Sequence, residues 1–108
     1  MKVMAQIFVD HDNLVKVINL LTGLEITGFY LIEYRGMAPK AWKNFCLSEN
    51  PDMALNAIRD QSEPGIMINT VIGSNNYRRI VDGLEEALRG KRYTIIGHEI
   101  SSIKVKGD

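Results

Sequence analysis

The chain has 108 residues, of which 45% are apolar and 24% are charged, and its formal net charge is zero. This length and composition predict one globular domain, residues 1–108, and exclude a disordered or fibrous chain. Because a neutral chain lacks the positive field that attracts phosphate backbones or anionic lipids, neither nucleic-acid binding nor direct membrane insertion is expected. The single cysteine, Cys46, excludes an internal disulfide framework and, with an N-terminus unlike a signal peptide, favours the cytoplasm.

The first third of the chain predicts a strand, a helix and a second strand. Residues Val3–Val9 alternate with the period of two that is typical of a strand with one buried face. Asp10–Asn13 then offers helix-capping side chains, and a helical stripe follows that ends at Gly23. This stripe consists of Leu14, Val17, Ile18 and Leu21. Aromatic and β-branched residues from Phe29 onward predict a second strand that ends near Gly36.

The rest of the chain predicts a long connection and then a second strand–helix–strand unit. Strand periodicity weakens over Met37–Pro64, but an asparagine followed by a proline and an acid predicts a helix over Pro51–Gln61 inside this connection. The remaining expected elements are a strand over Ile66–Ile72, a helix that begins at Tyr77 and ends at Gly90, a strand over Tyr93–Ile96, and a candidate fifth strand over Ile100–Val105.

This order of elements corresponds to two split βαβ units. It predicts an α+β, ferredoxin-like βαββαβ sandwich, in which two helices cover one face of an antiparallel sheet and a long loop follows the second strand. Apolar side chains occupy both faces of that second strand, since Tyr30 and Ile32 alternate with Phe29 and Leu31. A solvated sheet face does not need this pattern, so burial against other subunits is expected.

Two short runs resemble the PII signalling proteins. The run GFYLIEYRG from Gly28 to Gly36 resembles the family's second strand. In that strand a glycine stands at the start, and a glutamate, a basic residue and a glycine end it at the base of a long exposed loop. The terminal run IKVKGD resembles the family's closing segment, with Lys104 and Lys106 at the places of two arginines. The resemblance implies a homotrimer whose intersubunit clefts bind adenine nucleotides and whose loop contacts a protein target, such as a membrane transporter or an enzyme.

Two departures from the PII pattern affect the expected ligand. Lys40 replaces the glutamine that helps hold magnesium and 2-oxoglutarate in the family, which argues against 2-oxoglutarate sensing. The family's phosphate-binding stretch is shortened to Arg89–Arg92, which removes glycines that let backbone N–H groups approach phosphate. No cofactor is therefore assigned, and an adenine nucleotide is kept as the ligand that the resemblance implies.

The expected cleft ligand is a small anion, held by basic and glycine positions that the resemblance brings to a subunit boundary. These positions are Gly36, Lys40, Gly90, Lys91, Arg92, Lys104 and Lys106. The alternative is that these charges are solvated ends of ordinary elements. Trp42 and Phe45 give the long loop an apolar surface and are expected to contact the target or a neighbouring subunit, while packing onto their own domain is the alternative.

Residue types that bind metals or act in catalysis are present without a matching motif. The candidate metal ligands are Asp10, His11, Asp12, His98 and Glu99, but no His-x-x-His or cysteine pair occurs, so no metal site is assigned. Cys46 has no catalytic motif around it, so the chain is not expected to be an enzyme. Three alternatives stay open: a non-sensing oligomerisation or docking module of the same fold, a small ferredoxin-like enzyme that uses His11, His98 and Cys46, and a metal-binding protein.

Overall fold

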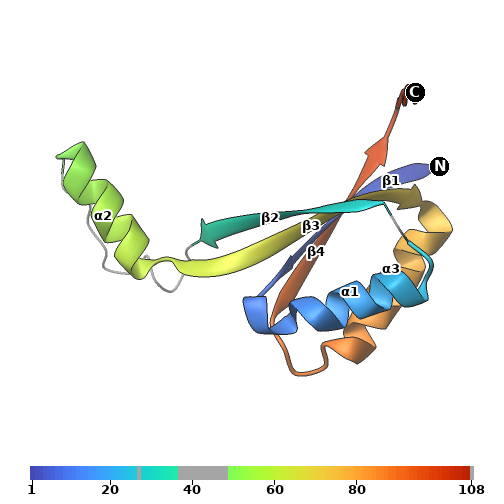
Figure 1. The fold of residues 1–108 in the computed structure, drawn as a ribbon, viewed down its shortest axis with the longest axis horizontal. Coiled ribbons are helices and arrows are strands. Elements are labelled where there is room, and N and C mark those ends of the chain that lie inside the picture. Colours follow the sequence, from blue (N-terminus) through green and yellow to red (C-terminus); the bar gives the residue numbers. More distant parts are fainter. Residues whose placement is uncertain (27, 37–48, 108) are drawn as a thin grey trace.

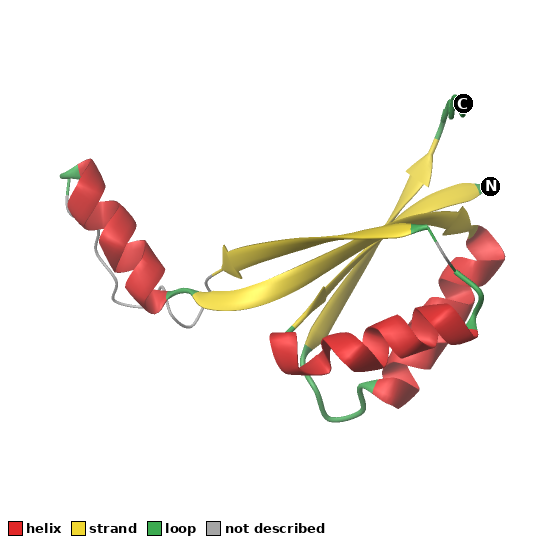
Figure 2. Cartoon of the chain, viewed as in Figure 1, coloured by secondary structure: helices red, strands yellow, loops and turns green. Residues whose placement is uncertain are grey.

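The computed structural model of the chain describes residues 1–26, 28–36 and 49–107. Its elements, drawn in Figure 1, are β1 (Lys2–Val9), the 3-10 turn η1 (His11–Asn13), α1 (Leu14–Gly23), β2 (Phe29–Gly36), α2 (Pro51–Gln61), β3 (Glu63–Gly73), α3 (Ser74–Ala87) and β4 (Tyr93–Ile100). The strands form one antiparallel sheet in the order β2-β3-β1-β4. Helices α1 and α3 lie together on one face of this sheet (Figure 2), so the predicted ferredoxin-like sandwich is confirmed.

The core lies between the two central strands and helices α1 and α3. Alternate residues of β1 and β3 face the helices and are buried, as their period of two predicts. The predicted helical stripes supply the other side, with Val17 and Leu21 of α1 and Ile80 and Leu84 of α3 fully buried. The buried apolar residues of this core are Ala5, Ile7, Val9, Val17, Leu21, Ile26, Ile66, Ile68, Ile72, Ile80, Leu84 and Leu88.

The β2–β3 hairpin extends beyond the helices and carries α2 at its far end (Figure 1). The two strands pair from Phe29 opposite Thr70 to Gly36 opposite Glu63. Helix α2 has the bounds that the sequence predicts, and its N-terminus is capped because the Asn50 side chain accepts hydrogen bonds from the backbone N–H groups of the next turn. None of the α2 residues is buried, so this helix adds little to the core of the described chain.

Several predicted element boundaries are wrong. Strand β3 begins at Glu63 rather than Ile66, and α3 begins at Ser74 rather than Tyr77. Strand β4 continues to Ile100, and residues 101–107 form no fifth strand, because Lys2 opposite Ile100 is the last β1 residue that can pair there. Within the described ranges the longest helix, α3, has 14 residues, and none of the helices there meets the length and hydropathy of a bilayer-spanning segment.

The predicted cap before α1 is also wrong. Asp10 and Asn13 make no side-chain capping hydrogen bond, and the Asn13 side chain is buried instead. At the other end of α1 the left-handed conformation falls on Glu25, with φ of 62°, rather than on Gly23. Gly90 does adopt a positive φ of 77° in the turn after α3, which a glycine accommodates without strain.

Candidate functional site

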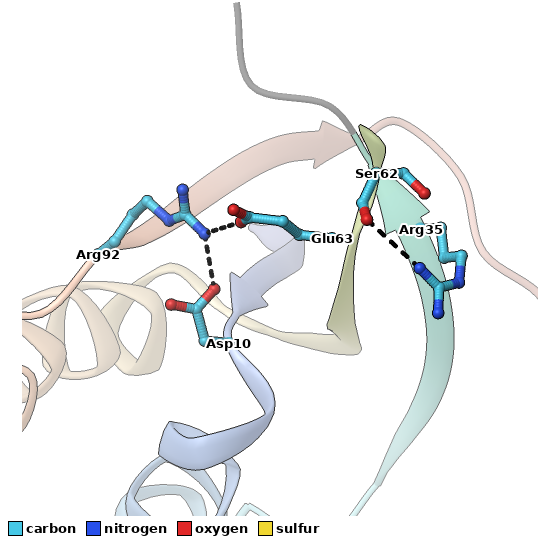
Figure 3. Close-up of polar contacts among 5 residues, drawn as sticks. All are labelled: Asp10, Arg35, Ser62, Glu63 and Arg92. Carbon is cyan, nitrogen blue, oxygen red and sulfur yellow. Dashed lines mark hydrogen bonds and ion pairs between the residues drawn. The ribbon is translucent and has the colours of Figure 1, made fainter. Parts of the chain in front are cut away.

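We call the segment between β2 and β3, residues 37–62, the excursion. A bifurcated ion pair joins three separate segments of the chain where β3 begins (Figure 3). Arg92 lies in the connection between α3 and β4, and its Nη2 is 2.7 Å from Glu63 Oε2 and 3.0 Å from Asp10 Oδ1. Glu63 is the first residue of β3, and Asp10 directly follows β1. The hydrogen bonds to Glu63 and Asp10 raise the pKa of Arg92 above its usual value, so the guanidinium stays charged throughout the physiological range.

The paired ends of β2 and β3, which we call the stem of the excursion, make a second polar contact and pack against an aromatic ring. Arg35 of β2 donates a hydrogen bond through Nη1 to the Ser62 carbonyl oxygen at 3.3 Å (Figure 3). The Tyr34 ring lies against Gly65 on the paired strand, where no side chain stands in its way. Phe8 of β1 meets the same ring edge-on, with centroids 5.9 Å apart. These contacts fix the geometry of both strands where the excursion leaves the sheet.

A pocket of about 400 Å³ opens beside the ion pair. Its lining combines the charged triad with the two aromatic rings and the end of β2, and includes Phe8, Asp10, Tyr34, Gly36, Glu63 and Arg92. The walls thus offer apolar ring surface next to a cation that is shared between two carboxylates. Such a combination suits an anionic group attached to a planar or apolar body, provided that the anion replaces one carboxylate as the partner of Arg92.

The predicted ligand residues do not all gather at this pocket in the single chain. Gly36 and Arg92 line it, whereas Gly90 and Lys91 line a second hollow of about 390 Å³ beside the C-terminal end of α3. Lys104 and Lys106 are exposed in the segment after β4, and β4 separates them from Arg92. Lys40 and the predicted partner-binding residues Trp42 and Phe45 lie outside the described residues, as does Cys46.

Sequence reasoning missed the acidic half of this site. From the sequence, Asp10 is interpreted as a helix cap and Glu63 as part of the connection after the second strand. In the structure both carboxylates accept a hydrogen bond from Arg92. The missed signal is that each acid directly adjoins the end of a strand, where side chains from distant segments meet. The aromatic wall was likewise missed, since Phe8 and Tyr34 are read as ordinary strand residues.

The residues considered as metal ligands are not assembled. His98 lies on β4 opposite Met4, and its Nε2 is 3.2 Å from Gln6 Oε1, while Asp10 lies at the opposite end of the same sheet. In the described ranges no group of three or more histidine, cysteine or acidic side chains could hold a metal ion. His11, next to Asp10, is likewise separated from His98 by the length of β1, so the two histidines of the enzyme hypothesis do not meet in one chain.

The sheet face opposite α1 and α3 is largely apolar and exposed, and we call it the open face. Its large apolar side chains include Tyr30, Ile32, Val71 and Ile96, which are between 40% and 58% exposed. Register places them with Met4, Gln6 and Phe8 of β1, whose alternate neighbours face the helices. Both faces of β2 carry exposed apolar residues, because Leu31 on the helix side is 45% exposed as well.

Comparisons of sequence and of structure relate this chain to known proteins. The family model described as "uncharacterized protein, homolog of nitrogen regulatory protein PII" matches residues 1–107. An uncharacterized protein of Methanocaldococcus jannaschii is 38% identical over 105 residues, covering 97% of each chain. Another, from Methanothermobacter thermautotrophicus, is 36% identical over 105 residues, covering 97% of this chain and 70% of the relative.

Among solved structures, a DUF3240 family protein from Shewanella baltica superposes with a TM-score of 0.70 at 10% identity, covering 98% of this chain and 97% of that one. The PII protein of Arabidopsis thaliana, bound to citrate, superposes with a TM-score of 0.65 at 13% identity, covering 93% of this chain and 78% of that one. At these identities the superpositions show a shared fold. With the family match over nearly its whole length, the chain belongs to the family of homologs of the nitrogen regulatory protein PII.

Proposed function

We propose that this protein is a cytoplasmic, non-catalytic regulator that assembles as a homotrimer, binds a small anion beside Arg92, and acts on a protein target through the 37–62 excursion. The observation that carries the proposal is the ion pair of Arg92 with Glu63 and Asp10. It brings Arg92, the cation that we propose binds the ligand, into direct contact with the first residue of β3. A change at the cation therefore acts directly on the base of the excursion.

Arg92, Glu63 and Asp10 together carry a net charge of −1, which repels an anion. An anion can therefore bind only if one of the two carboxylates moves away from the guanidinium. The Arg92 and Glu63 side chains are 62% and 67% exposed, and exposed ion pairs are weak enough to exchange partners readily. A phosphate or carboxylate ligand would take the place of Glu63 on the guanidinium, with bidentate geometry available to it. Glu63 would then release the end of the excursion.

The pocket chemistry favours an adenine nucleotide or a small carboxylate as the ligand. Phe8 and Tyr34 supply aromatic surface on which a base can stack, and Arg92 supplies the anion partner. The Arabidopsis PII protein of the same fold was solved with citrate, an anion of the second class. In the trimer, Lys104 and Lys106 of a neighbouring subunit would add positive charge at this cleft. Trp42 and Phe45 would contact the target, which we expect to be a membrane transporter or an enzyme.

The test is a thermal-shift screen with ATP, ADP, AMP and citrate, followed by calorimetric titration of every compound that stabilises the protein. A ligand that binds the native state alone raises the melting temperature by mass action. Arg92→Gln should abolish that shift, whereas Arg79→Gln, which removes an exposed arginine of α3 that does not line the pocket, should keep it. Equal affinities for wild type and Arg92→Gln would contradict the proposed role of Arg92.

One observation favours a second candidate, a non-sensing assembly module of the same fold. Arg92 has two carboxylate partners within its own chain, and Lys104 and Lys106 lie beyond the far end of β4. In this case the ion pair would only brace the excursion. An oligomer that none of the four compounds stabilises would support this module over the sensor.

A further inference from the structure

A further hollow, of about 380 Å³, lies beside the stem on the side of the sheet that carries the helices. Its lining includes two oppositely charged residues of β2, a histidine of η1 and part of the start of β3, namely His11, Glu33, Arg35, Pro64 and Ile66. Neither Arg92 nor its two acids line it, and Figure 3 shows Arg35 and Arg92 on opposite sides of the start of β3. The hollow is therefore distinct from the pocket beside Arg92.

The two opposite charges in this hollow do not pair with each other. Glu33 and Arg35 occupy alternate positions of β2, so they project from the same face of the sheet with Cα atoms about 6.6 Å apart. Both residues are exposed, and in the described part of the chain no ion pair joins Glu33 to Arg35 or to His11. The space between the two charges is thus open to a ligand that carries charges of both signs.

The guanidinium of Arg35 keeps donors for such a ligand. Its Nη1 donates to the Ser62 carbonyl oxygen at 3.3 Å, which holds the side chain against the end of the excursion. The N–H groups on Nε and Nη2 make no hydrogen bond within the described ranges, so they can bind a carboxylate through two parallel hydrogen bonds. Glu33 offers a carboxylate to a cation, and the ring of His11 supplies a third polar group.

We propose that this hollow binds a free α-amino acid, whose carboxylate pairs with Arg35 and whose ammonium group pairs with Glu33. The site goes beyond the proposed function and does not depend on it. A simple anion would be repelled by Glu33 and a simple cation by Arg35, whereas a zwitterion satisfies both charges at once. The volume lies in the range of small-molecule sites, and Pro64 and Tyr34 offer a wall for the side chain of the amino acid.

The test is an NMR titration of the ¹⁵N-labelled protein with each of the standard L-amino acids at millimolar concentration. At least one of them should shift the backbone amide resonances of Glu33, Arg35 and Ile66. The strongest binder is then titrated as its methyl ester, which lacks the carboxylate, and as its N-acetyl derivative, which lacks the ammonium group. Each derivative should bind about tenfold more weakly or worse, because each loses one charge-assisted contact.

Two variants assign the two ends of the ligand. Arg35→Gln should bind the amino acid and its methyl ester with equal affinity, because no cation remains to distinguish them. Glu33→Gln should likewise bind the amino acid and its N-acetyl derivative equally. The matched controls Arg79→Gln and Glu99→Gln remove exposed charges of the same types that do not line the hollow, and they should keep the wild-type preference for the zwitterion.

Two outcomes would overturn the inference. One is a wild-type protein in which no amino acid shifts the resonances around the hollow. The other is a wild-type protein that binds the amino acid and both derivatives with equal affinity. Either result would leave the proposed role of Arg92 intact, because that residue and its acids do not line this hollow.

Discussion

Replacement of Gly65 by alanine should destabilise the protein through one aromatic ring. A Cβ at Gly65 would lie 2.9 Å from Tyr34 Cε1, and closer still to Cζ and the hydroxyl. These are ring atoms that cannot bend away individually, and Phe8 packs edge-on against the ring. The ring must therefore move as a whole, which is the situation of an overpacked site. Such sites cost about 1 to 3 kcal/mol of unfolding free energy.

The assay is urea denaturation followed by circular dichroism, at one fixed protein concentration because assembly would make stability concentration-dependent. Gly28→Ala is the matched control, since a Cβ there meets nothing within 4 Å. It should leave the unfolding free energy within about 1 kcal/mol of the wild type, with any change in the stabilising direction.

A double-mutant cycle with Tyr34→Ala isolates the ring as the cause. Once the ring is removed, Gly65→Ala should lose most of its cost, giving a coupling of about 1 to 3 kcal/mol between the two sites. If Gly65→Ala costs the same with and without the ring, or costs nothing in the wild type, the overlap is not what makes this position a glycine.

Two further predictions test the helix of the excursion and the open face. Asn50→Ala removes the cap of α2 and should cost about 1 kcal/mol of local stability there. Amide hydrogen exchange should become faster in α2 and stay unchanged in β1, and an equal acceleration in both elements would refute a local effect. Ile32→Asp places a carboxylate on the exposed apolar face and should convert the proposed homotrimer into a folded monomer, as measured by light scattering. An oligomer of unchanged mass would show that Ile32 lies outside the contact between subunits.

Local patterns predicted much of the fold, because the elements depend on residues close together in sequence. The α2 bounds follow from Asn50 and the proline after it, and the α1 stripe follows from the helical period. The predicted ends of strands were wrong where pairing with a strand distant in sequence decides where a strand begins or ends. Glu63 belongs to β3 because Gly36 pairs with it across the hairpin, and β4 reaches Ile100 because Lys2 extends β1 beside it.

The candidate site was only half predictable for the same reason. Arg92 was marked by its charge, but its partner Asp10 is 82 positions away, and no local pattern joins the two. Asp10 next to a helix is equally typical of a cap, so the sequence alone could not separate the two roles. The burial of Asn69 was also hidden, since a polar residue in a strand is normally expected to face solvent.

Helix α2 stands away from the core at the end of a two-stranded stem, and none of its residues is buried. The free energy that holds the sandwich together therefore comes from other residues, so substitutions along α2 carry little penalty for folding. If the segment binds a protein target as proposed, the sheet and the two strands that carry α2 can be retained during evolution while α2 itself changes to fit a different target. The same separation makes α2 a practical grafting site. A different helix inserted between β2 and β3 could change which protein is bound, while the residues of the core stay as they are.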